Sequence, residues 1–188
     1  MRKFLFLPLL ALLASCGKNE DCDIVTPQPE DLVSPALYAT LSQSSTDPYN
    51  GPLEVLPCET NGSFYIGNYT AKGKQVPFPA YYLITNGIGK SQKYPLRLPV
   101  GTYNVIYWGY PDYFGTAGDA YLADPTLIIG KKLNTTSLEL RKIPGDTVYY
   151  PIHSLVYGTQ NINIGKDDLQ AHLKHCLLYT SDAADDLT

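Results

Sequence analysis

The chain has 188 residues, with 14 Lys and Arg against 18 Asp and Glu, which gives a formal net charge of −4 at pH 7. This mildly acidic balance, without any basic cluster, argues against nucleic acid as a partner. Tyr (16), Gly (15) and Pro (15) are abundant, and this composition is typical of a β-rich, turn-rich protein rather than a helical one.

Residues 1–15 have the order of a secretory signal peptide. A basic pair precedes the apolar run Phe4–Leu13, and small residues then lead to Cys16. The run is too short to cross a bilayer of ~30 Å as a helix. Leu-Ala-Ser-Cys at 13–16 resembles the bacterial lipobox, in which the cysteine is diacylated and the chain is cut just before it. We expect Cys16 to carry acyl chains such as palmitate, with an ordinary cleaved signal as the alternative.

Residues 16–35 are polar and acidic and contain three prolines, which predicts a lipidated linker that lifts the domain off the membrane. Gly17–Asp21 resembles the Lys-plus-acidic signal that sends lipoproteins of Bacteroidetes to the outer face of the outer membrane. The predicted location is therefore the cell outer membrane, with the protein lipid-anchored and exposed at the surface.

From residue 36 to residue 175, short strands alternate with turn signals. The stretches with strand composition are 36–42, 63–69, 81–85, 94–98, 102–109, 126–130, 137–140, 147–150 and 161–164. Turn chemistry at Asp47–Pro52, Asn86–Gly87 and Pro144–Asp146 separates them, and the alternation in 168–175 enters one more strand. Because no long amphipathic helix is present, we predict an antiparallel β-sandwich or barrel.

The stretch TYNVIYWG (102–109) is apolar on both faces. Tyr103, Val105 and Tyr107 fall on one face, while Ile106 and Trp108 fall on the other. This predicts a central strand covered on both sides, with Trp108 in the core rather than on a binding platform.

Catalytic signatures are missing from the sequence, which has no His-Glu-x-x-His, Gly-x-Ser-x-Gly or phosphate-binding glycine loop. We therefore predict a protein without enzymatic activity or cofactor. His172 and His175 would lie on opposite faces of a strand with no further ligand nearby, so no metal site is predicted. The three aspartates of the long connection 111–125 match no regular calcium loop.

Two cysteines remain once Cys16 is assigned to lipid and Cys176 to the tail. In an oxidising compartment Cys22 and Cys58 are candidates for a disulfide, and two unpaired thiols are the alternative.

Other candidate site residues lie in the second half of the chain. Asp146-Thr147-Val148 resembles the O-glycosylation acceptor of Bacteroidetes, so Thr147 is a candidate for modification, with a plain strand residue as the alternative. Tyr110, Tyr113 and Tyr121 lie in or beside the long connection 111–125, where aromatic rings suit either stacking on a ligand or packing on a partner.

The end of the chain has a separate explanation. CLLYTSDAADD, from Cys176 to Asp186, can be back-translated into the transposon adapter used in preparing sequencing libraries. We therefore expect residues 176–188 to be an artefact rather than part of the domain at 36–175, and the natural protein to continue past His175.

Three stretches together resemble one family. LRLPVGTYNVIYWG (96–109), SLELRKIPGDTVYYPIHSLVYG (137–158) and NINIGKDDLQAHLKH (161–175) share the layout of the FimB/Mfa2 fimbrial anchor and tip-associated lipoproteins of Bacteroidetes. The resemblance covers roughly residues 30–175. It implies a transthyretin-like Greek-key β-sandwich, the N-terminal domain of a two-domain protein. It also implies a non-enzymatic role in cell adhesion, anchoring a fimbria and joining fimbrial subunits by β-strand donation.

Within this superfamily, stalk fimbrillins lose their leader and first strand to an arginine-directed protease. No arginine lies between Cys16 and the first strand at 36–42, so the resemblance favours an anchor that keeps its lipid. The alternative function is a glycan-binding surface lipoprotein of a polysaccharide-uptake system, which would share the lipid, the β-fold and the exposed aromatic residues.

Overall fold

The computed structural model describes residues 27–41, 47–92, 94–111, 122–123, 125–150 and 154–176. In this part of the chain all regular structure is β-strand, apart from the short 3-10 turns η1 (Pro29–Asp31) and η3 (Leu133–Thr135). The all-β prediction is confirmed. No helix among these residues has the length and apolar character needed to span a membrane.

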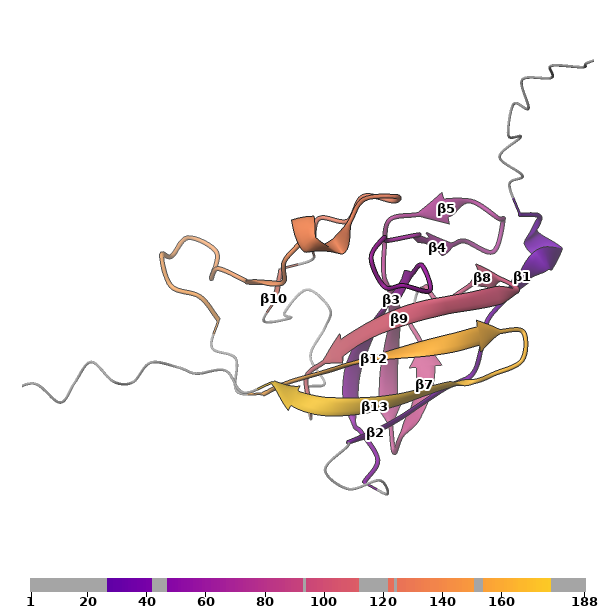
Figure 1. The fold of residues 1–188 in the computed structure, drawn as a ribbon. Coiled ribbons are helices and arrows are strands. Elements are labelled where there is room, and N and C mark those ends of the chain that lie inside the picture. The colour runs from indigo at the N-terminus through magenta and orange to yellow at the C-terminus, as the bar shows by residue number, and fades with distance from the viewer. Residues whose placement is uncertain are drawn as a thin grey trace, which may run out of the picture.

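Seven strands form a closed barrel in the order β12-β13-β2-β7-β6-β3-β9, and three two-stranded ribbons, β1-β8, β4-β5 and β10-β11, lie outside it (Figure 1). The strands are β1 (Leu32–Val33), β2 (Leu37–Leu41), β3 (Gly51–Cys58), β4 (Asn68–Tyr69), β5 (Gln75–Val76), β6 (Ala80–Thr85), β7 (Ile88–Ser91), β8 (Leu98–Pro99), β9 (Gly101–Gly109), β10 (Leu122–Ala123), β11 (Glu139–Leu140), β12 (Leu155–Ile164) and β13 (Leu169–Cys176).

The sheet differs from the predicted sandwich in how it closes. Its pairs are antiparallel except for β13 and β2, which run parallel, and this pairing joins the last described strand to the first strand of the barrel. The seven strands therefore form one ring instead of two stacked sheets. Strand composition predicts that strands exist, but a pairing between two ends of a domain leaves no local pattern in the sequence.

Alternating side chains fill the barrel. Val105 and Tyr107 of β9 and Ile162 and Ile164 of β12 are at most 2% exposed and belong to one buried cluster. The period of two is that of a strand with one face turned inward. Each aliphatic side chain buried in this way stabilises the fold by roughly 1.5–3 kcal/mol relative to exposure to water.

A second cluster lies on the outer face of β9. Trp108, 3% exposed, packs there with Leu56 of β3, and Leu127 and Leu133 from the segment 125–136 lie against the same cluster. The prediction that this strand is covered on both faces, with Trp108 in the core, is confirmed. Beyond this contact the chain from 136 to 150 extends away from the barrel (Figure 1).

Some of the predicted strands are present in the structure, and others are shorter or absent from the described residues. Those at 36–42, 81–85, 102–109 and 161–164 lie in barrel strands, and the alternation in 168–175 becomes β13. Those at 63–69, 94–98 and 137–140 shrink to two-residue strands, while 126–130 and 147–150 contain no strand. The first described ribbon, β1-β8, begins before the expected domain boundary at residue 36.

Two barrel strands were not predicted. β3 contains Pro52 and Pro57, which are depleted in strand interiors and suggest a turn. β7 is short and mostly polar and exposed. It follows Asn86 and Gly87, whose positive φ angles of 50° and 77° make the tight turn of a hairpin with β6.

Candidate functional site

The barrel closes at β2 through pairings of unequal length. On one side β2 pairs with β13 over five residues, from Leu37 opposite Leu169 to Leu41 opposite Leu173. On the other side it meets β7 through a single pair, Tyr38 opposite Ile88. We call this contact the β2–β7 seam, and it is the shortest pairing in the ring.

The residues at the seam are exposed and apolar. Tyr38 is 40% exposed and Ile88 is 55% exposed. The Ala39 N–H donates to the Gly87 carbonyl at 2.9 Å and holds the seam at one end. The barrel's inner side is more tightly packed, because a Cβ added to Gly89 would lie 2.9 Å from Leu37 Cδ2. Both strands belong to the closed ring, so an extended partner segment could add to either of them only where this one-pair contact opens.

β13 is also incompletely paired with its other neighbour. The β12–β13 register covers Leu155 to Tyr157 opposite Cys176 to Lys174 and then stops. Beyond it the Tyr107 hydroxyl accepts a hydrogen bond from the His172 N–H at 3.2 Å and lies 3.4 Å from the His172 carbonyl. The Tyr107 phenol from β9 therefore replaces a backbone hydrogen bond between β12 and β13. As a result, the pair β2–β13 is joined to its neighbours β7 and β12 by short pairings on both sides.

Gly158 makes room for this phenol. A Cβ at Gly158 would lie 2.4 Å from Tyr107 Cε2 and 2.6 Å from the His172 carbonyl oxygen. Burial raises the pKa of Tyr107, with the backbone hydrogen bond to His172 opposing part of that rise, so the hydroxyl stays protonated at neutral pH.

Cys58, proposed as a disulfide partner, is fully buried in the cluster around Trp108. Its Sγ donates to the Leu56 carbonyl at 3.7 Å, and burial raises its pKa to about 12. A thiol with such a pKa is almost entirely protonated at neutral pH and correspondingly unreactive. Cys22 lies outside the described residues, as does Cys16.

The remaining candidate residues are spread over the fold. Tyr110 is 3% exposed and packs in the cluster with Trp108, which makes it a core residue. Tyr113 and Tyr121 lie outside the described residues. Thr147 is exposed in a turn of the 136–150 segment, and its N–H donates to Asp146 Oδ1 at 2.6 Å.

His172 and His175, the two histidines of the described residues, make separate contacts. His172 Nδ1 lies 3.0 Å from Thr40 Oγ1, and His175 Nδ1 lies 3.4 Å from Ser154 Oγ. Within the described ranges no group of three or more His, Cys, Asp or Glu side chains comes together.

The sequence was compared with family models, curated proteins and solved structures. The model of the family described as fimbrillin-A associated anchor proteins Mfa1 and Mfa2 matches residues 25–178, a range that contains every described element. Neither the curated proteins nor the solved structures gave a match. The family is a structural one, associated with fimbriae at the cell envelope. The resemblance read from the motifs is thus confirmed, and the chain belongs to the Mfa2 family of fimbrillin-A associated anchor proteins.

Proposed function

We propose that this protein anchors a fimbria to the outer membrane and thereby serves cell adhesion. The family match carries the fimbrial part of the proposal. The lipobox-like sequence before Cys16 supports attachment through acyl chains, since two or three chains give a stable anchor where one gives only marginal binding. The Lys-plus-acidic residues that follow Cys16 support a position on the outer face.

We also propose that fimbrial subunits join the barrel by strand donation at the β2–β7 seam. A donated strand would pair with β7 once the seam opens, and would place alternate side chains against the barrel interior. Three features support this: the single pair Tyr38–Ile88, the exposure of both side chains, and the short pairing of β13 with β12. Main-chain hydrogen bonds would supply affinity, and the pockets for alternate side chains would set the register.

The anchor proposal predicts the fate of a Cys16→Ser variant. Tagged wild-type protein should sediment with outer membrane and co-isolate with fimbrial subunits after shearing, because the acyl chains hold the assembly. Cys16→Ser should move both the protein and its bound subunits into the soluble fraction. Mass spectrometry of the intact protein measures the acyl chains, and fractionation followed by immunoblotting measures the location.

Cys22→Ser is the matched control, because it removes a thiol six residues away without touching the lipobox. Two results would count against the proposal: a wild-type protein isolated from membrane without any fibre protein, or Cys16→Ser remaining with the membrane. The first would remove the fimbrial role and the second would remove the lipid anchor.

Thr147 is proposed as an O-glycosylation site. It lies in an exposed turn, where a modifying enzyme can reach its hydroxyl. Protein from its native host should carry a glycan mass that disappears in Thr147→Ala and persists in Thr135→Ala, which changes an exposed threonine of η3 outside the acceptor-like sequence. Peptide mass spectrometry that finds Thr147 unmodified would contradict the proposal.

A further inference from the structure

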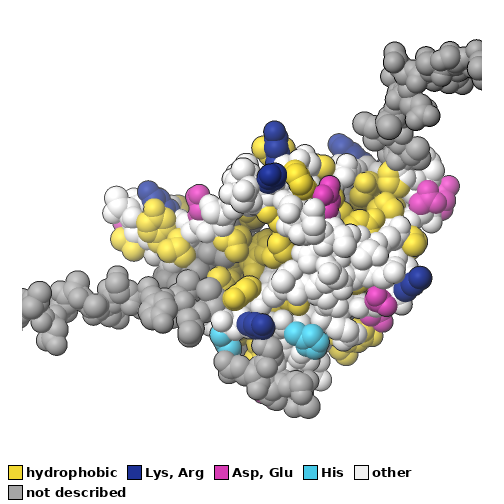
Figure 2. Space-filling model, viewed as in Figure 1, with side chains coloured by type: hydrophobic (Ala, Val, Ile, Leu, Met, Phe, Trp, Pro, Cys, Tyr) yellow, Lys and Arg dark blue, Asp and Glu magenta, His cyan; other side chains and the backbone are white. Residues whose placement is uncertain are grey.

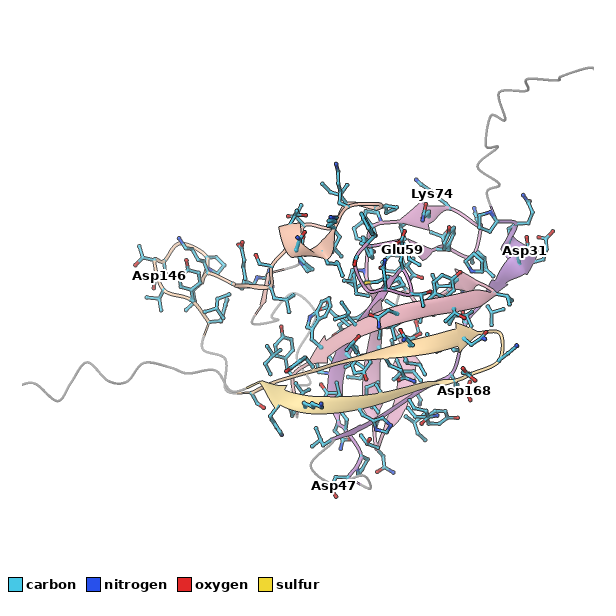
Figure 3. The ribbon with its side chains drawn as sticks, in the orientation of Figure 1. Asp31, Asp47, Glu59, Lys74, Asp146 and Asp168 are labelled. Carbon is cyan, nitrogen blue, oxygen red and sulfur yellow. The ribbon has the colours of Figure 1, made fainter. Side chains whose placement is uncertain are left out.

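A groove lies between the turn 59–63 and the start of β9, on a part of the molecule separate from the β2–β7 seam. Its cavity volume is about 420 Å³, within the range of ~300–1,000 Å³ usual for small-molecule sites. The residues that line it are Glu59, Thr60, Asn61, Ile66, Thr102 and Tyr103. Figure 3 shows Glu59 where the chain leaves β3.

Hydrogen bonds hold the two walls of this groove in place. The Glu59 N–H donates to the Phe64 carbonyl at 2.9 Å, and Asn61 Oδ1 accepts the Ser63 N–H at 2.9 Å, which fixes the turn. Thr60 Oγ1 donates to the Thr102 carbonyl at 2.8 Å and ties the turn to β9. The groove is therefore formed before any ligand arrives, which lowers the entropic cost of binding.

Several polar groups of the groove have no partner in the described part of the chain. The exposed Glu59 carboxylate makes no hydrogen bond or ion pair there, and neither the Asn61 Nδ2 donors nor the Thr102 hydroxyl have a protein partner. Tyr103 donates its hydroxyl proton to the Pro99 carbonyl at 3.0 Å and keeps an acceptor. The walls thus present acceptors and donors side by side.

The remaining lining is apolar. Ile66 and Tyr103 are both half-buried and pack against the edge of the barrel core. Among the described residues, no lysine, arginine or histidine lines the groove, so these residues offer no positive charge for a phosphate or carboxylate ligand. On the face seen in Figure 2, side chains of both charges are scattered among hydrophobic ones, and neither charge gathers into a patch.

We propose that this groove is a binding site for a neutral saccharide. Neighbouring sugar hydroxyls both donate and accept, so they match a carboxylate and an amide placed on one wall. The C–H face of the ring fits the apolar side chains of Ile66 and Tyr103.

The test is a titration of the full chain with free glucose, galactose, mannose and N-acetylglucosamine. Calorimetry measures the affinity, and amide chemical shifts locate the site. At least one of these sugars should bind and shift the amides of Asn61, Gly62 and Thr102. Glu59→Gln should weaken that binding by about tenfold or more, since hydrogen bonds to a charged group contribute ~1.5–3 kcal/mol.

Glu139→Gln is the control, because it removes one exposed carboxylate from β11, outside the groove lining, and should leave the affinity unchanged. Thr102→Val is a second test that keeps side-chain volume and removes the unpaired hydroxyl. The proposal fails if none of the sugars binds at tens of millimolar, if the shifts map to another surface, or if both Glu variants lose binding equally. Binding of free lysine in place of the sugars would also overturn it, in favour of a cationic ligand.

Discussion

Gly158→Ala is expected to destabilise the barrel by about 3 kcal/mol, the upper part of the range for an overpacked core position. The added Cβ would lie 2.4 Å from Tyr107 Cε2 and 2.6 Å from the His172 carbonyl oxygen, and one of these neighbours is backbone. Either β13 moves away from β12, or the Tyr107 phenol gives up its hydrogen bond with the His172 N–H. Thermal unfolding should show a fall of roughly 6–12 °C in Tm for a domain of this size.

Gly101→Ala is the matched control for this prediction. Gly101 also lies in a barrel strand with an ordinary φ angle, and a Cβ there would meet Tyr103 atoms at 3.4–3.5 Å, an ordinary van der Waals contact. Its substitution should be neutral or slightly stabilising, because alanine reduces the entropy of the unfolded chain. Equal Tm values for the two variants would show that neither the Tyr107 ring nor the His172 carbonyl crowds Gly158.

A double variant separates the two contacts at Gly158. Tyr107→Leu removes the ring and its hydroxyl but leaves the His172 carbonyl in place. If the ring causes most of the clash, Gly158→Ala should cost less in the Tyr107→Leu background than in the wild type. An unchanged cost would assign the clash to the β13 backbone.

The barrel strands that were predicted correctly can be recognised from a few neighbouring residues. In β9 and β12 apolar residues recur at the strand period, and burial in the closed barrel follows from that pattern. Trp108 was assigned to the core because its neighbours on both faces are apolar. Such inferences need only a few consecutive residues.

The features that were not predicted depend on contacts between distant segments. β3 was missed because Pro52 was assigned to the turn Asp47–Pro52 and Pro57 is a residue depleted in strand interiors, although β6 and β9 pair with β3 on either side. Tyr110 was taken for a ligand or partner aromatic, but its burial comes from packing with Trp108 and Leu155. Local composition carries no information about such packing.

The candidate sites were hidden from the sequence for the same reason. The β2–β7 seam exists because a strand near residue 40 meets a hairpin near residue 88 over one residue pair only. The groove at Glu59 exists because Thr60 is tied to Thr102. The family motifs cover β8, β9, β12 and β13 and part of the segment between β9 and β12. They contain Thr102 and Tyr103 of the groove and no residue of the β2–β7 seam, but nothing in the motifs shows that these two residues line a groove.

Locking the β2–β7 seam is expected to abolish capture of fimbrial subunits. Tyr38 and Ile88 are register partners in an antiparallel pair, whose Cα atoms typically lie ~4.5–5.5 Å apart, within the range of ~4.4–6.8 Å for a disulfide. A Tyr38→Cys/Ile88→Cys variant, made with Cys22 and Cys176 replaced by serine, should therefore oxidise without moving the backbone. Co-isolation of subunits should be lost under oxidising conditions and return on reduction.

The control lock joins Asn104 and Asn161, register partners on β9 and β12 whose side chains already hydrogen-bond at 3.1 Å. An Asn104→Cys/Asn161→Cys disulfide adds the same kind of crosslink to a nine-residue pairing that strand donation leaves intact. Capture that survives this lock but not the Tyr38–Ile88 lock would locate the entry of the donated strand at the seam. Capture that survives both locks would exclude the seam as the entry point of the donated strand. It would not exclude the anchor function, because both locks leave Cys16 unchanged and the subunits could then bind another surface.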